Sequence, residues 1–348
     1  MPELLIPHQK SCAPEAEQTP DRPPPLPFDC IGIGVCAVDH LSLVARYPQA
    51  NEKTEALAYV VQAGGPVPTA LATASWWGAR CAYIGKLGND ADGDFVLRQL
   101  AHFGVDTSMV VRARRGFTPR AMIWVDQRTG QRSVVLNRPP HFGLTLQDVS
   151  RRQVLRGRIL HVDGRETQVA LAATRWARRA GRVVVCDLGS LRKESELLLQ
   201  QVDCAVVSST FVRQLYGECE LATATRRLLQ LGPRVAVVTA GEQGCWWATG
   251  ERLFHQPAFA VEAVDTTGAG DVFHGAFLFG LSRGWELARV VLWASAVAAL
   301  KCRKLGGQAG IPTLAQVKHL LRQAKGTPLP LWAEEAKKQG AEVPKPPR

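Results

Sequence analysis

The stretch VDTTGAGDVFHGA, residues 264–276, decides how the rest of the chain is interpreted. A glycine-alanine-glycine step precedes Asp271 and opens an apolar, helix-like run. Glycines let a backbone approach a ligand closely, and the free N–H groups of a first helical turn attract anions. A carboxylate at this point would repel a bound anion, so the position of Asp271 requires an explanation. A general base that takes the proton from a hydroxyl attacking a phosphoryl group would provide one. The structural alternative is a glycine turn into a core helix, with Asp271 stabilising the helix dipole. His274, further along this helix, is expected to pack in the core.

Strand-like and helix-like runs alternate on the N-terminal side of this stretch. The strand-like runs are CIGIGVCAV, RCAYIGKL, RILHVDG, RVVVCDLG, VDCAVVSS and RVAVVTAG. The helix-like runs between them are TALATASWWGA, DFVLRQLAHFGV, QVALAATRWARRA, SELLLQQV and ATRRLLQLG. This alternation predicts an α/β fold whose mostly parallel sheet has helices on both faces. Residues 40–63 and 118–137 break the pattern with strand character, the second as a hairpin turning at residues 126–130, and predict a separate small β layer.

Four segments carry a resemblance to a known family. VDTTGAGDVFHGAFLFGL, GIGVCAVD, AGGPVPTALATASWWGA and VVTAGEQGC resemble signatures of the ribokinase (PfkB) family of sugar kinases, and the similarity covers residues 30–321. The resemblance implies a ribokinase-like, doubly wound sheet with a small β lid over the sugar. The kinase domain would span residues 29–325, with the lid built from about residues 40–63 and 118–137. Because residues 1–28 are rich in Pro, Glu and Gln, we expect a disordered arm there, and a flexible tail at residues 326–348.

The resemblance also implies roles for individual residues. Asp271 would deprotonate the sugar hydroxyl. The remaining implied contacts are Gly268, Ala269 and Gly270 with the transferring phosphoryl group, Asp39, Gly64 and Gly65 with the sugar, Thr239, Gly241 and Gly244 with the nucleotide, and Asp265 and Thr267 with a monovalent cation. ATP and Mg²⁺ are the implied cofactors, with K⁺ in those members that use one. The family often carries an Asn-x-x-Glu motif that organises magnesium, whereas this chain has Ser208, Ser209, Thr210 and Phe211 there, which leaves the magnesium position open.

The segment QPAFAVEAVDTTGAGDVFHGAF is similar to the bacterial sulfofructose kinases of this family. The resemblance implies that Lys53, Asn137 and Arg165 grip the sulfonate of a ketose whose primary hydroxyl receives the γ-phosphoryl group of ATP. Cationic and amide donors of this kind suit a permanent anion. Each residue also has a structural alternative: Lys53 as a solvated lid residue, Asn137 as a hairpin cap and Arg165 as a partner of Asp163 or Glu166.

Two further functions stay open. The segments HVDGRET and SLVARYPQANE also resemble fructokinases and ketohexokinases, so a neutral sugar, a ketose phosphate or a ribokinase-type substrate is the competing interpretation. The missing Asn-x-x-Glu motif and the formal net charge of +11 motivate a non-catalytic, kinase-fold binding protein. The basic runs RRQVLRGR and RWARRAGR do not combine with interleaved aromatic residues into a recognisable nucleic-acid-binding module, so we expect solvated helix faces and no nucleic-acid partner.

The remaining features concern location and assembly. Nine cysteines without a CxxC pair are typical of free thiols in a reducing compartment. With no signal peptide and no membrane-spanning stretch, we expect a cytoplasmic protein without a membrane partner. Members of the family are often dimers joined through their lids, and the apolar lid residues Tyr59, Val60, Ile123 and Trp124 would permit a homodimer.

Overall fold

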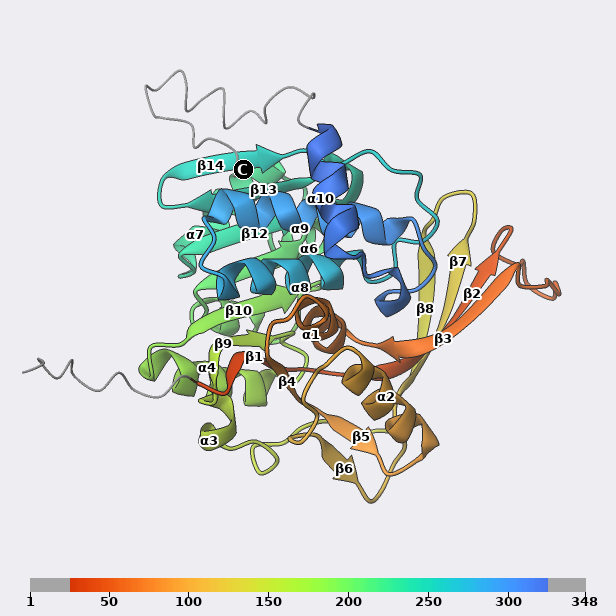
Figure 1. The fold of residues 1–348 in the computed structure, drawn as a ribbon, viewed down its shortest axis with the longest axis horizontal. Coiled ribbons are helices and arrows are strands. Elements are labelled where there is room, and N and C mark those ends of the chain that lie inside the picture. The colour runs from red at the N-terminus through yellow and green to blue at the C-terminus, as the bar shows by residue number, and fades with distance from the viewer. Residues whose placement is uncertain (1–25, 325–348) are drawn as a thin grey trace, which may run out of the picture.

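A computed structural model describes residues 26–324, and its centre is one twisted sheet covered on both faces (Figure 1). The sheet has the strand order β14-β13-β12-β11-β10-β9-β1-β4. Its strands are β1 (Phe28–Ile33), β4 (Cys81–Ile84), β9 (Gly157–Val162), β10 (Val183–Leu188), β11 (Cys204–Ser208), β12 (Val235–Thr239), β13 (Cys245–Thr249) and β14 (Arg252–Gln256). The neighbouring strands from β4 to β12 pair in parallel, whereas the pairs β12–β13 and β13–β14 are antiparallel. The predicted fold class is confirmed.

Helices form the two outer layers. They are α1 (Pro66–Trp76), α2 (Ala91–His102), α3 (Arg151–Val154), α4 (Thr167–Arg179), α5 (Ser195–Leu199), α6 (Ser209–Tyr216), α7 (Leu221–Gln230), α8 (Ala269–Ser282), α9 (Leu287–Cys302) and α10 (Leu314–Gln323), with 3₁₀ turns η1 (Gly241–Gln243) and η2 (Gln308–Gly310). One core cluster lies beneath α1, α8 and α9, and a second lies beneath α4, α6 and α7. The strands are apolar on both faces because each face packs against helices. No helix of residues 26–324 has the length and apolar character to cross a bilayer.

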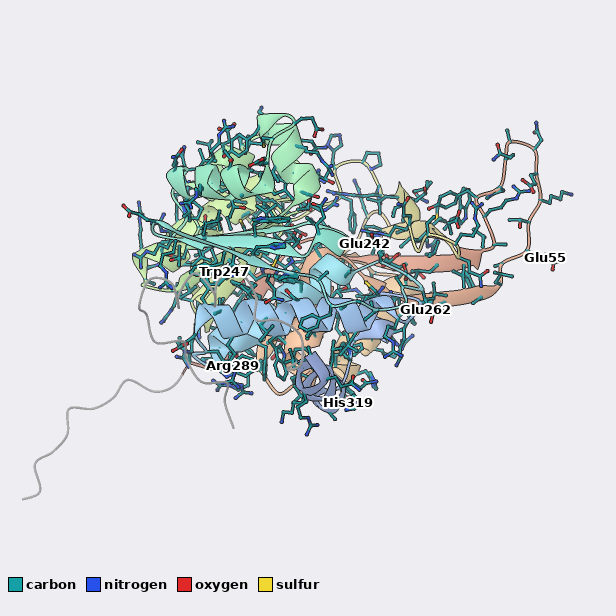
Figure 2. The ribbon with its side chains drawn as sticks, turned by 90° about the horizontal axis from the view of Figure 1, so that it is seen from above. Glu55, Glu242, Trp247, Glu262, Arg289 and His319 are labelled. Atoms are coloured by element: carbon teal, nitrogen blue, oxygen red, sulfur yellow. The ribbon has the colours of Figure 1, made fainter. Side chains whose placement is uncertain are left out.

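A second sheet projects from one side of the core. It has the order β3-β2-β7-β8, made of β2 (Ala37–Val44), β3 (Ala58–Gly64), β7 (Arg120–Asp126) and β8 (Arg132–Asn137). A short pair, β5 (Lys86–Gly88) and β6 (Val111–Ala113), lies below it. We call the four-stranded sheet the lid. Figure 2 shows Glu55, in the β2–β3 loop, at the outer tip of the lid and far from the core.

Two apolar runs that were each predicted to be one strand form parts of two strands. The run at residues 30–38 leaves the central sheet after β1 and enters the lid as β2, and residues 80–87 divide into β4 and β5. Gly34 and Gly85 lie at these two divisions. Of the arm predicted for residues 1–28, residues 1–25 lie outside the described residues. Phe28, the last residue of that predicted arm, is the first residue of β1. The tail predicted for residues 326–348 lies wholly outside them.

Candidate active site

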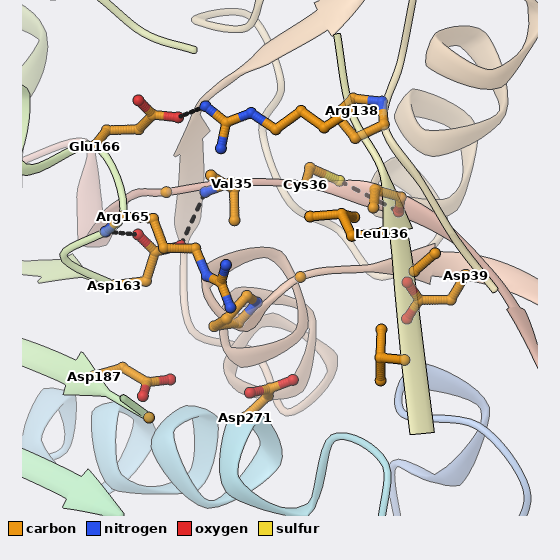
Figure 3. A pocket seen from close by; sticks show the side chains of 18 of the residues that line it. Val35, Cys36, Asp39, Leu136, Arg138, Asp163, Arg165, Glu166, Asp187 and Asp271 are labelled. Carbon is orange, nitrogen blue, oxygen red and sulfur yellow. Dashed lines mark hydrogen bonds and ion pairs between the residues drawn. The ribbon is translucent and has the colours of Figure 1, made fainter. Parts of the chain in front are cut away.

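A cavity of about 440 Å³ lies where the lid meets the carboxyl ends of the central strands. Its floor comes from the loops after β1, β9 and β10 and from the first turn of α8, and its roof comes from β7 and β8 of the lid. Figure 3 shows Asp39, Asp187 and Asp271 around this space, with Arg165 extending into it from above. The cavity therefore joins residues that are more than two hundred positions apart in the chain.

Asp271 stands in the first turn of α8, beside backbone groups that suit an anion. Gly268 caps the helix with a φ of 74°, and a Cβ there would lie 2.8 Å from the Cα of Gly307. Only glycine fits both constraints, which explains the glycine at this point of the loop. The first amides of a helix lack intrahelical partners, although the Ala269 N–H here donates to the Thr266 carbonyl at 3.2 Å. Burial raises the pKa of Asp271, and the cations His274, Arg132, Arg165 and Lys301 oppose the rise.

Asp39 faces the same cavity from β2 and is 8% exposed. Burial raises its pKa to about 7, Asp271 and Asp265 add to the rise, and Arg132 opposes it. Gly64 lies opposite, and a Cβ at that position would overlap the Asp39 carboxylate. Gly65 caps α1 with a φ of 104°, and a Cβ there would collide with the Val35 carbonyl oxygen. Gly64 thus leaves the room that Asp39 occupies, and Gly65 lets the Val35 carbonyl approach the start of α1.

His274 lies three residues after Asp271 on α8 and is buried, as the sequence predicted. The Nδ1 atom of His274 is 2.8 Å from the Gly270 carbonyl oxygen, and its Nε2 atom is 3.2 Å from the Val206 carbonyl oxygen. Nδ1 also lies 3.4 Å from a carboxylate oxygen of Asp187 on β10. Both nitrogens therefore face acceptors, an arrangement that only the doubly protonated imidazolium satisfies. The sequence offered no signal for the partners of His274.

Asp187 and His161 complete this buried cluster. Burial raises the pKa of Asp187, and His274 opposes the rise. The ring of His161, on β9, lies 5.6 Å from the ring of His274. Burial, together with the neighbouring His274, lowers the pKa of His161 to about 3. The cluster therefore contains His161, which is neutral, and His274, both of whose ring nitrogens face acceptors.

Four arginines line the cavity: Arg132, which opposes the raised pKa of Asp39 and Asp271, and Arg138, Arg165 and Arg192. Arg138 pairs with Glu166 at 3.4 Å, whereas neither Arg165 nor Arg192 forms an ion pair within residues 26–324. Burial lowers the pKa of Arg192. The positive charges of Arg165 and Arg138 lower it further, and Asp163 opposes this fall. Guanidinium groups crowded in this way suit an anionic ligand. The sequence had singled out Arg165 only.

The predicted trio of Lys53, Asn137 and Arg165 is not assembled. Lys53 lies exposed in the loop at the outer tip of the lid, two positions from Glu55 (Figure 2). Asn137 ends β8 and is exposed, while its neighbours Leu136 and Arg138 line the cavity. Because successive side chains of a strand point to opposite faces, residues 132, 134 and 136 reach the cavity and residue 137 does not. Asp163, the alternative partner of Arg165, instead accepts the N–H groups of Val35 and Arg165 at 2.9 and 3.0 Å.

The residues predicted for the nucleotide lie outside this cavity, on the next strands of the sheet. Thr239 ends β12 and donates to the Val207 carbonyl at 3.3 Å. Gly241 and Gly244 bracket η1 with φ angles of 55° and 81°. A Cβ at Gly244 would overlap the Gln256 carbonyl oxygen, whereas Gly241 faces open space.

The segment that replaces the Asn-x-x-Glu motif is the start of a helix. Ser208 caps α6 by accepting the N–H of Phe211 at 3.0 Å and donating to the Gly189 carbonyl at 2.9 Å. Among residues 26–324 no group of three or more His, Cys, Asp or Glu side chains is placed to hold a metal ion.

Asp265 and Thr267, the residues predicted for a monovalent cation, are both buried in the loop before α8. The ammonium of Lys301 donates to the Asp265 carbonyl oxygen at 2.7 Å. Burial lowers the pKa of Lys301, and the Asp265 carboxylate opposes the fall. The hydroxyl of Thr267 is buried and has no hydrogen-bond partner in the described part of the chain.

The fold combines a doubly wound core, a β lid and a carboxylate at a glycine-rich helix start. Comparison with known proteins gives the family. The protein-family model described as "pfkB family carbohydrate kinase" matches residues 30–314, and the chain belongs to that family.

Individual relatives agree with this assignment. The chain is 28% identical to a ribokinase from Staphylococcus aureus over 299 residues, which covers 82% of this chain and 97% of the relative. It is 26% identical to ketohexokinase from Mus musculus over 282 residues, which covers 78% and 94%. The fold is similar to that of Arabidopsis thaliana ribokinase complexed with ribose and ATP, with a TM-score of 0.72, 24% identity and coverage of 85% and 99%.

Proposed function

We propose that this protein is an ATP-dependent kinase that phosphorylates a primary hydroxyl of a ketose carrying an anionic group. The observation that carries the proposal is the cavity that Asp39 and Asp271 share with Arg138, Arg165 and Arg192. Membership of a carbohydrate kinase family supports phosphoryl transfer to a sugar, and the similarity to ketohexokinase supports a ketose. The arginines support the anionic group.

In the proposed reaction, Asp271 accepts the proton of the sugar hydroxyl. The hydroxyl oxygen then bonds to the γ-phosphorus, and the bond from that phosphorus to the β-phosphate oxygen breaks, so ADP leaves with the electron pair. The N–H groups of Gly268, Ala269 and Gly270 would stabilise charge on the transferring group, aided by the dipole of α8. Mg²⁺ bound to the triphosphate would neutralise charge on its oxygens.

Asp39 would hold the sugar rather than react with it. A carboxylate accepts hydrogen bonds from two neighbouring hydroxyls, and Asp39 faces the cavity beside Gly64 and Gly65. Its raised pKa of about 7 means that it accepts from both hydroxyls only above that pH. Thr239, Gly241 and Gly244 would lie beneath the nucleotide, outside the sugar cavity.

The anionic group would lie against Arg138, Arg165 and Arg192. A sulfonate, as in sulfofructose, and a phosphate, as in a ketose phosphate, both fit guanidinium donors. Lys53 and Asn137 have no part in this receptor within one copy of the chain, because they lie outside the cavity. Contact between two lids is the arrangement that would give Lys53 a part, and a homodimer through the exposed lid residues Tyr59 and Trp124 remains part of the proposal.

The test is ADP release with Mg-ATP against fructose, fructose phosphate, sulfofructose, ribose and a nucleoside, with Asp271→Asn as the blank. We expect an anionic ketose to give the highest kcat/KM and the blank to bind ATP without turnover. A preference for fructose or ribose would leave the phosphoryl-transfer mechanism in place and remove the anionic substrate. Turnover retained by Asp271→Asn would remove Asp271 as the base.

A neutral sugar is the second candidate, and the similarity to ribokinase and ketohexokinase supports it. A non-catalytic binding protein is the third. No turnover on any sugar, together with salt-dependent binding to random DNA, would favour that third function.

A further inference from the structure

The ammonium of Lys301 is buried against the loop that leads to Asp271. Lys301 and Asp265 are both 0% exposed. The Lys301 Nζ atom donates to the Asp265 carbonyl oxygen at 2.7 Å and lies 3.5 Å from the Asp265 Oδ2 atom. The N–H of Thr267 donates to Oδ1 and the N–H of Gly306 donates to Oδ2, each at 2.7 Å. Each oxygen of the Asp265 side chain, and its carbonyl oxygen, therefore has a donor from the chain itself.

This donor set does not fit potassium at Asp265. A potassium ion is bound by oxygen atoms that replace its hydration shell, and here the oxygens of Asp265 already accept N–H or ammonium groups. An ammonium, by contrast, needs acceptors only, and Lys301 finds a carbonyl and a carboxylate. The unpartnered hydroxyl of Thr267 is one neutral oxygen and does not make a cation site by itself.

The surrounding backbone fixes the lysine in this position. The Cys302 carbonyl, at the end of α9, accepts the N–H groups of Val264 and Asp265 at 2.8 and 3.1 Å. A Cβ at Gly310 would lie 3.0 Å from the Cγ and Cε atoms of Lys301, so glycine leaves room for the aliphatic stem. The end of α9 and the loop before α8 are thereby held as one unit, with the ammonium between them.

We infer that Lys301 is a built-in monovalent cation: its ammonium takes the place of potassium beside Asp265 and orders residues 265–271 without any added cation. The inference rests on the proposed kinase activity for its kinetic measurement and on the fold alone for its thermal measurement. A charge supplied by the chain is present at every potassium concentration, so the activity of the wild-type protein should not follow the concentration of this ion.

The experiment compares wild type with Lys301→Ala, Lys301→Met and Lys304→Met in potassium chloride and in choline chloride at equal ionic strength. Lys304 is an exposed lysine three positions away and serves as the control. Lys301→Ala opens a space beside Asp265, whereas methionine fills it without a charge. Propylammonium chloride, which has the part of the lysine side chain that alanine lacks, is the second rescue probe.

We expect kcat/KM of wild type and Lys304→Met to change by less than about twofold between the salts. We expect Lys301→Ala to lose activity in choline and to regain about tenfold or more in potassium or propylammonium, a range typical of coupling between sites. Lys301→Met should stay inactive in all three salts. In melting experiments without substrate, potassium should raise the melting temperature of Lys301→Ala only, because a ligand stabilises the folded state that binds it.

Several results would overturn the inference. One is a wild-type protein that needs potassium for turnover or melts at a higher temperature in it. Another is a folded Lys301→Met variant with wild-type activity in choline, since the charge would then be unnecessary. If both Lys301 variants fail to fold, the salt response of wild type decides the question alone. Absence of turnover on every sugar would refute the proposed function, while the melting experiment would still test the cation.

Discussion

Replacing His274 by asparagine should move the acid limb of the pH–rate profile towards higher pH. The asparagine amide can still donate to the Gly270 carbonyl, as Nδ1 of His274 does at 2.8 Å, but it carries no charge. Removing the imidazolium removes a cation that opposes the raised pKa of Asp271. A general base works only when ionised, so a higher pKa means that activity is lost at a higher pH as acid is added.

The magnitude follows from the helix. Residues three apart on α8 have Cβ atoms about 5–6 Å apart. Two unit charges about 6 Å apart at an effective dielectric constant near 20 interact by about 2.8 kcal/mol, which corresponds to about 2 pKa units. The Asp187 carboxylate, 3.4 Å from His274, would also take up a proton more readily and so repel Asp271 less. We therefore expect the acid limb of kcat/KM to rise by about 1–2 pH units, with the alkaline plateau largely kept.

The assay is ADP release with the preferred sugar between pH 5 and pH 9, roughly the range in which a general base of this kind titrates. His161→Asn is the matched control, because His161 is equally buried in the same cluster but is held neutral by a pKa of about 3. Its acid limb should not move. If His274→Asn melts near the wild-type temperature and its acid limb coincides with that of wild type, His274 carries no charge and the reasoning fails.

Three more substitutions test the cavity. Gly64→Ala should lower kcat/KM for the sugar by about 100-fold, since its Cβ would displace the Asp39 carboxylate, while the KM for ATP measured at saturating sugar stays unchanged. Arg165→Ala should raise KM for anionic sugars by about 10–100-fold, the loss expected for one charged hydrogen bond, and an equal loss for neutral sugars would contradict the receptor. Asp39→Asn should raise the melting temperature at pH 8 more than at pH 5 while sugar binding is lost. The folded pKa of Asp39 is about 7 against an ordinary 3.8, so the folded state keeps a proton that the unfolded state releases, and stability falls as pH rises between these values, by about 4 kcal/mol at most. A melting temperature that responds equally at both pH values would contradict this cause.

The sequence predicted which residues meet wherever the common direction of the parallel strands is enough to bring them together. Asp39 is in a strand that leaves the central sheet at its carboxyl edge, Arg165 follows another parallel strand, and Asp271 opens a helix that packs on the same sheet. Parallel strands place these points at one edge, so a pattern of strands and glycine-rich turns suffices to predict their meeting. The antiparallel edge strands β13 and β14 and the helix α9 were not predicted, and none of their residues lines the cavity.

The orientation of single side chains, and their partners from other segments, were harder to predict. Asn137 was placed in the sugar site, but a strand period of two residues separates it from the cavity that Leu136 and Arg138 reach. Arg192 lies in the loop after β10, where an arginine in LRKES is typical of a solvated turn. Lys301 follows the apolar run LWASAVAAL, where a terminal lysine usually extends to water. Its burial depends on Gly310 and on Asp265, which no local pattern connects to it.

The distribution of charge explains why the arginines, rather than the rest of the basic surface, are available to a substrate. The buried carboxylates around the cavity have partners supplied by the chain: Asp265 has Lys301, and Asp187 has His274. Arg132 counters the charge of both Asp39 and Asp271. Arg165 and Arg192 stay without an ion pair in the described chain, and burial together with the charge of Arg165 lowers the pKa of Arg192. Both guanidinium groups face the cavity, so an anionic group on the proposed substrate would weaken the repulsion between Arg165 and Arg192, whereas a neutral sugar would leave it in place.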